Sequence, residues 1–195
     1  MLVIGLTGSI AMGKSEAAKI LAAKGLLVFD ADAEVHKLYD SEEGAAIIRP
    51  FVPEAARGGK VDRKIITEHV LKDPALLTRL EKGVHAEIRR RRQGFIDRAR
   101  ASGAKAVVLD IPLLFETGSE KNVDKTIVIS STPELQRARA LERGLTEERL
   151  ALILARQMPD ADKRKRADAV VFNNSTLMEM KKQLLAFLSD WKVKI

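Results

Sequence analysis

Short runs of apolar residues recur along the chain, and within each run the apolar positions are consecutive rather than alternating with polar ones. The five runs lie at residues 2–6, 26–29, 106–109, 126–129 and 169–172. Consecutive apolar residues in so short a run are typical of strands covered on both faces, as in a parallel sheet. Helix-favouring segments separate the runs, so the pattern predicts an α/β fold of three layers around a five-stranded parallel sheet.

The segments between the runs carry the apolar periodicity of helices. We expect helices over residues 15–24, 33–39, 63–71, 74–100, 133–143, about 146–158 and 176–191. The long interval 36–103 holds no strand-like run and exceeds a simple crossover loop, so we interpret it as a helical insertion that binds an acceptor substrate. Residues 1–35 and 104–195 would then form the core domain, with a helical lid at about 137–160.

The first apolar run leads directly into a glycine-containing loop with the sequence Gly8-Ser9-Ile10-Ala11-Met12-Gly13-Lys14-Ser15. This matches G-x-x-x-x-G-K-[ST], the phosphate-binding P-loop, and a helical sequence follows it as the motif requires. We expect Lys14 to reach the β- and γ-phosphates of ATP and the Ser15 hydroxyl to bind Mg²⁺. The loop residues and the adjacent Glu16 are the candidate nucleotide contacts; an ordinary glycine-containing turn is the alternative.

Acidic residues follow two of the predicted strands. Asp30 and Asp32 come after the second strand, where a carboxylate could accept the proton of an attacking hydroxyl group. In an extended chain the two side chains would point the same way, although either could instead cap the helix that follows. Asp110 ends the third strand, the position of an acid that orders Mg²⁺ or its waters, and Glu116 is a weaker candidate for substrate or metal contact.

Two arginines, Arg139 and Arg143, lie four residues apart on one predicted helical face. Like charges at this spacing repel each other unless an anion lies between them, and the phosphates of ATP would be such an anion. A solvated basic face is the alternative, and we prefer it for the runs at 89–92 and 163–166. His85 could contact substrate, but a lone histidine more often has a structural role.

Composition narrows the classes of function. The 195 residues include no cysteine, which excludes disulfides and thiolate chemistry and fits a cytoplasmic protein. We expect no signal peptide and no membrane span. The net charge of +7 favours polyanionic ligands. Because basic runs interleaved with aromatic residues are lacking, we favour small phosphorylated ligands over nucleic acid.

Several motifs, taken in order along nearly the whole chain, resemble those of the dephospho-coenzyme A kinase family. They are Gly5-Leu6-Thr7-Gly8 through Gly13-Lys14-Ser15, Asp30-Ala31-Asp32, Lys60-Val61-Asp62-Arg63, Val84-His85, Asp110-Ile111-Pro112-Leu113-Leu114-Phe115-Glu116, Arg156-Gln157-Met158-Pro159, Lys163 and Arg166-Ala167-Asp168. The family loop commonly reads Gly-Gly-Ile-Gly-Ser-Gly-Lys, so Ser9, Ala11 and Met12 depart from it. Ala86 also stands where the family often has proline.

The resemblance implies transfer of the ATP γ-phosphate to the ribose 3′-hydroxyl of dephospho-coenzyme A, the last step of coenzyme A biosynthesis. It implies that Asp32 is the base and that Arg63 and His85 contact the acceptor. Asp110 and Leu113 are further candidate substrate contacts. Arg139 would act with Lys14 in catalysis from a mobile lid, and the protein would be a monomer or a small homo-oligomer.

Two other functions fit parts of the sequence. A kinase for another small acceptor, such as a nucleoside or nucleotide, would use the same loop, acid and lid; only the signature at 110–116 argues against it. A nucleotide-dependent switch or a nucleic-acid-binding module would use the positive charge instead. The short chain and the acid after the second strand favour a kinase.

Overall fold

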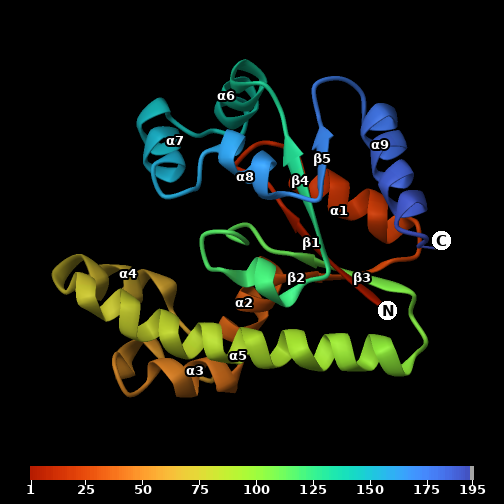
Figure 1. Cartoon of the computed structure of the whole chain (residues 1–195). Coiled ribbons are helices and arrows are strands. Elements are labelled where there is room, and N and C mark those ends of the chain that lie inside the picture. The colour runs from red at the N-terminus through yellow and green to blue at the C-terminus, as the bar shows by residue number, and fades with distance from the viewer. Residues whose placement is uncertain (194–195) are drawn as a thin grey trace. The chain divides into compact units, whose positions relative to one another are not determined.

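A parallel five-stranded sheet organises the protein, whose computed structural model describes residues 1–193 (Figure 1). The strands are β1 (Leu2–Thr7), β2 (Leu27–Asp30), β3 (Ala106–Asp110), β4 (Lys125–Ser130) and β5 (Ala169–Phe172), in the spatial order β2-β3-β1-β4-β5. All five coincide with the predicted apolar runs. Because β1 is central, the loop that follows it lies at the middle of the sheet's carboxyl edge.

Helices connect the strands. They are α1 (Lys14–Ala23), α2 (Ala31–Tyr39), α3 (Glu42–Ile48), α4 (Arg63–Lys72), α5 (Pro74–Ala101), α6 (Pro133–Glu142), α7 (Glu147–Leu154), α8 (Asp160–Arg166) and α9 (Leu177–Asp190), with short 3₁₀ turns at Pro53–Ala55 and Ser119–Asn122. No helix within residues 1–193 is long and apolar enough to cross a membrane.

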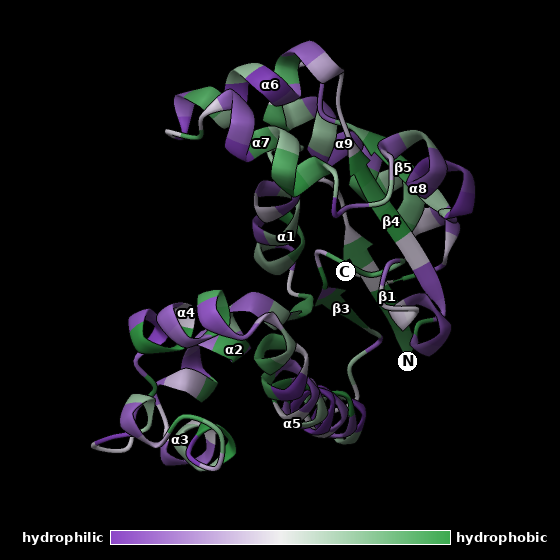
Figure 2. Cartoon of the chain, turned by 90° about the vertical axis from the view of Figure 1, so that its left-hand side faces the viewer, coloured by the Kyte–Doolittle hydropathy of each residue, from purple (hydrophilic) through white to green (hydrophobic). Residues whose placement is uncertain are grey.

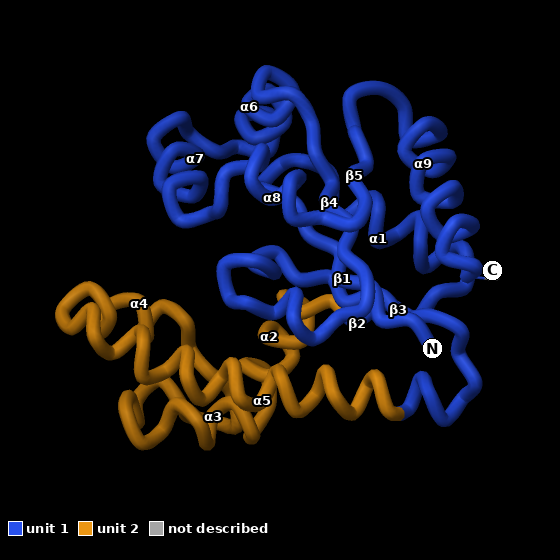
Figure 3. The backbone as a smooth tube through the Cα atoms, in the orientation of Figure 1, with its two compact units in different colours: residues 1–29, 98–195 blue, residues 30–97 orange. Residues whose placement is uncertain are grey.

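The chain forms two compact units (Figure 3). Unit 1 comprises Met1–Phe29 and Arg98–Ile195 and contains the sheet, while unit 2 comprises Asp30–Asp97. Unit 2 overlaps the predicted insertion at 36–103, but it begins before α2, part of which we had assigned to the core segment 1–35. The role of the insertion in binding an acceptor stays a prediction at this point.

The core of unit 1 lies between the sheet and a layer formed by α1 and α9, which run side by side (Figure 1). Ala17 and Leu21 of α1 and Met180, Leu184 and Leu188 of α9 pack with apolar residues from β1, β3, β4 and β5. In Figure 2 the strands are largely green, whereas the outer faces of the helices carry purple polar positions. The consecutive apolar residues of the strands thus correspond to a buried central layer.

Unit 2 has an apolar core of its own. Its buried members are Leu38, Ala45, Ile48, Val52, Ala55, Ala56, Val61, Leu76, Leu80 and Val84. They come from α2, α3, α5 and the turns between them, while partly buried Ile65, Ile66 and Val70 of α4 pack against this core. This core holds α2 and the start of α4 in place, and both carry candidate site residues.

The local structure differs from the sequence predictions in three ways. The helix expected to reach about residue 158 ends at Leu154, because the N–H groups of Arg156 and Gln157 bond to carbonyls three residues back and Pro159 follows. Helices α3 and α8 were not predicted, since each has only seven residues, and α3 also contains Gly44. Asp30 and Asp32 do not share an extended segment, because α2 begins at Ala31.

Candidate active site

The loop between β1 and α1 has the backbone shape of a phosphate-binding loop. Gly13 caps α1 with φ of 98°, a left-handed conformation that glycine adopts readily. A Cβ atom on Gly13 would overlap the side-chain amide of Asn173, and one on Gly8 would lie 2.6 Å from the carbonyl oxygen of Ile129. Both glycines of the motif are therefore required by close packing around the loop.

Ala11 is the strained residue of this loop. Its φ is 61°, in the left-handed region where a Cβ atom costs roughly 1–2 kcal/mol. The resemblance places a glycine at this position in the family, so the departure at Ala11 falls where glycine would relieve strain. The methyl group is buried against Ala140 of α6 and Leu150 of α7, which offsets part of that cost.

Lys14 and Asp110 contact each other at the carboxyl edge of the sheet. The Lys14 ammonium lies against the Asp110 carboxylate, and their side chains are only 16% and 4% exposed. Asp110 is the last residue of β3, the strand beside β1, so the topology of the sheet brings the two together. The structure thus places the lysine of the loop and the acid of the 110–116 motif in one cluster.

The oxygen atoms near this cluster fit Mg²⁺. Ser15 is exposed in the first turn of α1, and Asp110 supplies a carboxylate. No group of three or more His, Cys, Asp or Glu side chains that could hold a metal occurs within residues 1–193. A cation held by one or two protein oxygens together with phosphate oxygens and water is the usual arrangement for Mg²⁺.

Ser9, Glu16 and Arg139, which we also predicted to contact the nucleotide, differ in their burial and in their bonding partners. Ser9 is buried, and its carbonyl accepts a hydrogen bond from the Met12 N–H group at 3.2 Å. Glu16 lies on the outer face of α1 in an ion pair with Lys19. Arg139 of α6 donates to the Ser131 hydroxyl at 3.2 Å and to the Asn173 carbonyl at 2.9 Å.

Asn173 connects Arg139 with the loop. Its side-chain amide donates to the Met12 carbonyl at 3.0 Å, while its own carbonyl accepts from Arg139. Arg143, the second arginine of the predicted face, is the exposed C-terminal cap of α6. Asn173, Gln136 and Gln157 all contact the loop through their side chains. We predicted no role for them from the sequence, although Gln157 lies in the motif at 156–159.

Glu116 has protein partners. Its carboxylate lies 2.8 Å from the ammonium of Lys163, which is fully buried, and accepts a hydrogen bond from the Met158 N–H group at 2.8 Å. Burial would raise the pKa of Glu116, but Lys163 and the Met158 N–H group outweigh it and hold that pKa below its ordinary value. The basic run 163–166 is therefore not wholly a solvated surface.

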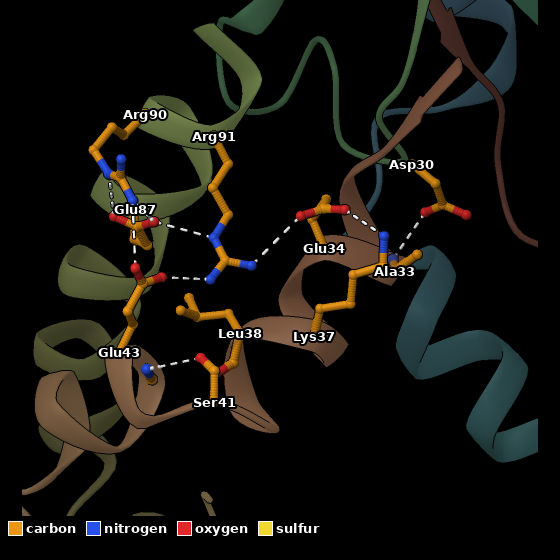
Figure 4. A network of polar contacts seen from close by, with 11 residues as sticks. Asp30, Ala33, Glu34, Lys37, Leu38, Ser41, Glu43, Glu87, Arg90 and Arg91 are labelled. Atoms are coloured by element: carbon orange, nitrogen blue, oxygen red, sulfur yellow. Dashed lines mark hydrogen bonds and ion pairs between the residues drawn. The ribbon is translucent and has the colours of Figure 1, made fainter. Parts of the chain in front are cut away.

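In unit 2, Asp30 and Asp32 have separate roles. The Asp30 carboxylate accepts from the Ala33 N–H group at 2.9 Å and caps α2 (Figure 4). Asp32 is exposed in the first turn of α2, and within residues 1–193 its carboxylate makes no hydrogen bond or ion pair. The alternative interpretation as a helix cap thus applies to Asp30, which leaves Asp32 available to a substrate.

Asp32 and Arg63 line one hollow of about 340 Å³ on unit 2. The remaining lining residues are Val35, His36, Tyr39, Ile66 and Thr67. The Arg63 guanidinium lies 4.9 Å from the centre of the Tyr39 ring. Burial raises the pKa of Tyr39, and the charge of Arg63 only partly counters it, so the phenol stays neutral near pH 7.

A second hollow of about 700 Å³ shares His36, Tyr39 and Arg63 with the first. It adds the cations Arg57, Lys60 and Lys64, but the acids Asp40, Glu54 and Asp62 line it as well, so its lining is of mixed charge. His85 is exposed on α5 and lines neither hollow. Leu113 is 39% exposed in unit 1, three residues after Asp110.

An ion-pair network fixes α2, which carries Asp32 (Figure 4). Arg91 of α5 reaches Glu87 at 3.0 Å, Glu43 of α3 at 2.6 Å and Glu34 of α2 at 3.5 Å. Hydrogen bonds from Arg90 and Arg91 hold the pKa of Glu87 below its ordinary value against its partial burial. Part of the basic run 89–92 therefore holds three helices together.

A parallel sheet whose central strand leads into a phosphate loop, with a lysine and an acid beside it, defines a P-loop nucleotide-binding protein. Solved kinases share this fold: the shikimate kinase of Acinetobacter baumannii superimposes with a TM-score of 0.55 at 14% identity. The family model for dephospho-CoA kinase matches residues 2–179. The chain belongs to the dephospho-CoA kinase family.

Individual relatives agree with this assignment. A dephospho-CoA kinase of Rhodopseudomonas palustris is 52% identical over 189 residues, covering 96% of this chain and 94% of that protein. One from Agrobacterium fabrum is 51% identical over 172 residues, 88% of each. Among solved structures, dephospho-CoA kinase from Campylobacter jejuni has a TM-score of 0.72 at 29% identity, covering 97% of this chain and 96% of that one.

Proposed function

We propose that this protein transfers the γ-phosphate of ATP to the ribose 3′-hydroxyl of dephospho-coenzyme A, the final step of coenzyme A biosynthesis. Family membership over residues 2–179 supports this substrate. The observation that carries the mechanism is the Asp32 carboxylate, which has no protein partner within residues 1–193 and lines a hollow with Arg63. A cytoplasmic location and a monomeric or small homo-oligomeric state are part of the proposal.

The loop and Lys14 bind the nucleotide phosphates. The α1 N-terminus and the backbone N–H groups of the loop favour anions, and Lys14 moves from Asp110 to the β- and γ-phosphates. The Ser15 hydroxyl, with the Asp110 carboxylate, would hold Mg²⁺, which would supply positive charge to those phosphates. Asp110 keeps Lys14 oriented toward the loop until the phosphates bind, and Arg139 stabilises charge on the transferred group.

The hollows of unit 2 bind the acceptor. Asp32 accepts the proton of the 3′-hydroxyl as the hydroxyl oxygen bonds to the γ-phosphorus. The bond between the γ-phosphorus and the bridging oxygen of ATP breaks, and ADP leaves. Arg63 contacts the acceptor next to Asp32. In the second hollow, Arg57, Lys60 and Lys64 contact the diphosphate of dephospho-coenzyme A, although the same hollow also has acidic lining residues. Asp110, Leu113 and His85 remain predicted substrate contacts.

The test measures ADP release from ATP and Mg²⁺ with and without dephospho-coenzyme A. We expect turnover that depends on the acceptor and falls at least a hundredfold in Asp32→Asn, in line with loss of a general base, while ATP still binds. Asp30→Asn is the matched control, because asparagine caps a helix about as well as aspartate. Turnover in the wild type that does not depend on the acceptor would refute dephospho-coenzyme A as the substrate. Full activity in Asp32→Asn would refute the assignment of Asp32 as the general base.

A further inference from the structure

Two glutamines from later parts of the chain hold one residue of the phosphate loop. The side-chain amide of Gln136 donates a hydrogen bond to the Ile10 carbonyl at 2.8 Å. The Ile10 N–H group donates to the Oε1 atom of Gln157 at 3.1 Å. Both backbone polar groups of Ile10 are thus satisfied by side chains rather than by the loop itself.

Neither glutamine is an incidental surface contact. Gln136 lies in α6 and is 8% exposed, which is unusual for this residue type. Gln157 is partly buried in the turn after α7, and the next residue, Met158, is anchored by its N–H group to Glu116. The buried Lys163 in turn forms an ion pair with Glu116. The segment that carries Gln157 is therefore anchored to the rest of unit 1 through Met158 and Glu116.

Apolar packing joins the same elements. Ala11 is buried with Ala140 of α6 and Leu150 of α7, and Ile10, Leu145 and Leu154 pack around them. The loop therefore meets α6 and α7 through hydrogen bonds at Ile10 and through a methyl group at the strained Ala11. A residue held in a sparsely populated conformation persists only when its surroundings fix it.

We propose that Gln136 and Gln157 are positioning residues that keep the phosphate loop in its nucleotide-binding shape and couple it to α6 and α7. The proposal rests on the proposed function only in taking ATP as the ligand of the loop. A loop held in its bound shape loses less conformational entropy on binding, so the clamp raises nucleotide affinity. Because Arg139 lies on α6, the same contacts link its helix to the loop.

The test uses Gln136→Met and Gln157→Met, which keep length and volume but remove the hydrogen bonds. The chain offers a matched control in Gln183 of α9, whose side chain also bonds both backbone groups of one residue, Phe172 on the edge strand β5, at 2.9 and 3.0 Å. Gln183→Met therefore removes the same pair of bonds from Phe172, which does not itself bond to the loop and directly precedes the loop contact Asn173.

We expect each clamp variant to weaken ATP binding about tenfold, the effect of one lost buried hydrogen bond, with KM for dephospho-coenzyme A unchanged. The double variant should lose less than the product of the two effects, because both side chains hold one residue. Amide hydrogen exchange at Ile10 should accelerate in Gln157→Met, and Gln183→Met should match the wild type in all these measurements.

Direct ATP binding is measured without acceptor, so its result stands even if dephospho-coenzyme A proves not to be the substrate. Wild-type ATP affinity and unchanged Ile10 exchange in both clamp variants would overturn the proposal. An equal loss of ATP affinity in Gln183→Met would also overturn it. If a methionine variant does not fold, Gln136→Asn and Gln157→Asn replace it, since their shorter amides cannot reach Ile10.

Discussion

Lys163 and Glu116 form an ion pair of 2.8 Å in which the lysine side chain is wholly buried and the glutamate side chain is 15% exposed. The pair joins α8 to the end of the 110–116 motif that follows β3. Burying two charges costs desolvation free energy, which only the close contact between the opposite charges repays. Losing either partner of this pair would therefore destabilise the fold. The acid of the pair also bonds the Met158 N–H group, which connects the pair to the turn that presents Gln157.

Glu116→Gln should therefore lower the free energy of unfolding by about 3 kcal/mol or more, because it leaves the ammonium of Lys163 buried without a counter-charge. Chemical denaturation measures this change. The double variant Glu116→Gln/Lys163→Met should recover most of the loss. Lys165→Met is the control, since its ion pair with Asp162 is exposed; a loss there as large as in Glu116→Gln would contradict the explanation.

Acid should weaken the same pair. The pKa of Glu116 is lowered in the folded protein from an ordinary value of 4.5, so its carboxylate stabilises the fold above that pH. This stability is lost as the pH falls through the lowered pKa. Denaturation of the wild type and the Glu116→Gln/Lys163→Met variant between pH 3 and 6 isolates the effect. The wild type should lose stability relative to the double variant as the pH falls, and a stability difference that does not change with pH would contradict this explanation.

Gly13→Ala should destabilise the protein more than Gly25→Ala. Both glycines have positive φ, 98° and 87°, so both variants carry the cost of a left-handed alanine, roughly 1–2 kcal/mol. Only at Gly13 does the new methyl group overlap Asn173; at Gly25 no atom lies within 4 Å. Thermal denaturation and ATP titration should show Gly13→Ala alone losing nucleotide binding, and equal behaviour would mean that the overlap is relieved without cost.

Arg63→Met should raise KM for dephospho-coenzyme A about tenfold or more, as expected for loss of a charged contact, and leave ATP binding unchanged. The guanidinium lines both hollows of unit 2 and lies over Tyr39. Lys72→Met removes a charge from the far end of α4, outside the hollows. Lys72→Met is therefore the control, and its KM values should equal those of the wild type. Steady-state kinetics with each substrate varied in turn measure both variants. An unchanged KM for the acceptor in Arg63→Met would show that this residue does not contact the acceptor.

The sequence was sufficient for the sheet and the loop because both depend on local patterns. The strand at 106–109 is recognisable from its own apolar residues, and the loop from the spacing of Gly8, Gly13 and Lys14. The start of α2 was harder to predict, since nothing in the sequence distinguishes the role of Asp30 from that of Asp32. Only the start of the helix at Ala31 separates the cap from the free carboxylate.

Contacts between distant segments could not be predicted from such patterns. Gln157 lies 147 residues from Ile10 and Gln136 lies 126 residues from it. Lys163 sits within four consecutive basic residues, and nothing in that run distinguishes the buried side chain from its solvated neighbours. Contacts of this kind depend on how distant segments pack in the folded chain, and a local sequence motif carries no information about that packing.

The chain leaves the sheet at β2 and returns at β3, and these strands are neighbours in the order β2-β3-β1-β4-β5. An excursion between adjacent strands can be lengthened, shortened or exchanged without changing the order of any strand or the path of the loop after β1. The apolar core of unit 2 is also its own. Given the acceptor-binding role that we propose for unit 2, replacing this one inserted segment would change the acceptor and leave the strand order and the loop after β1 as they are.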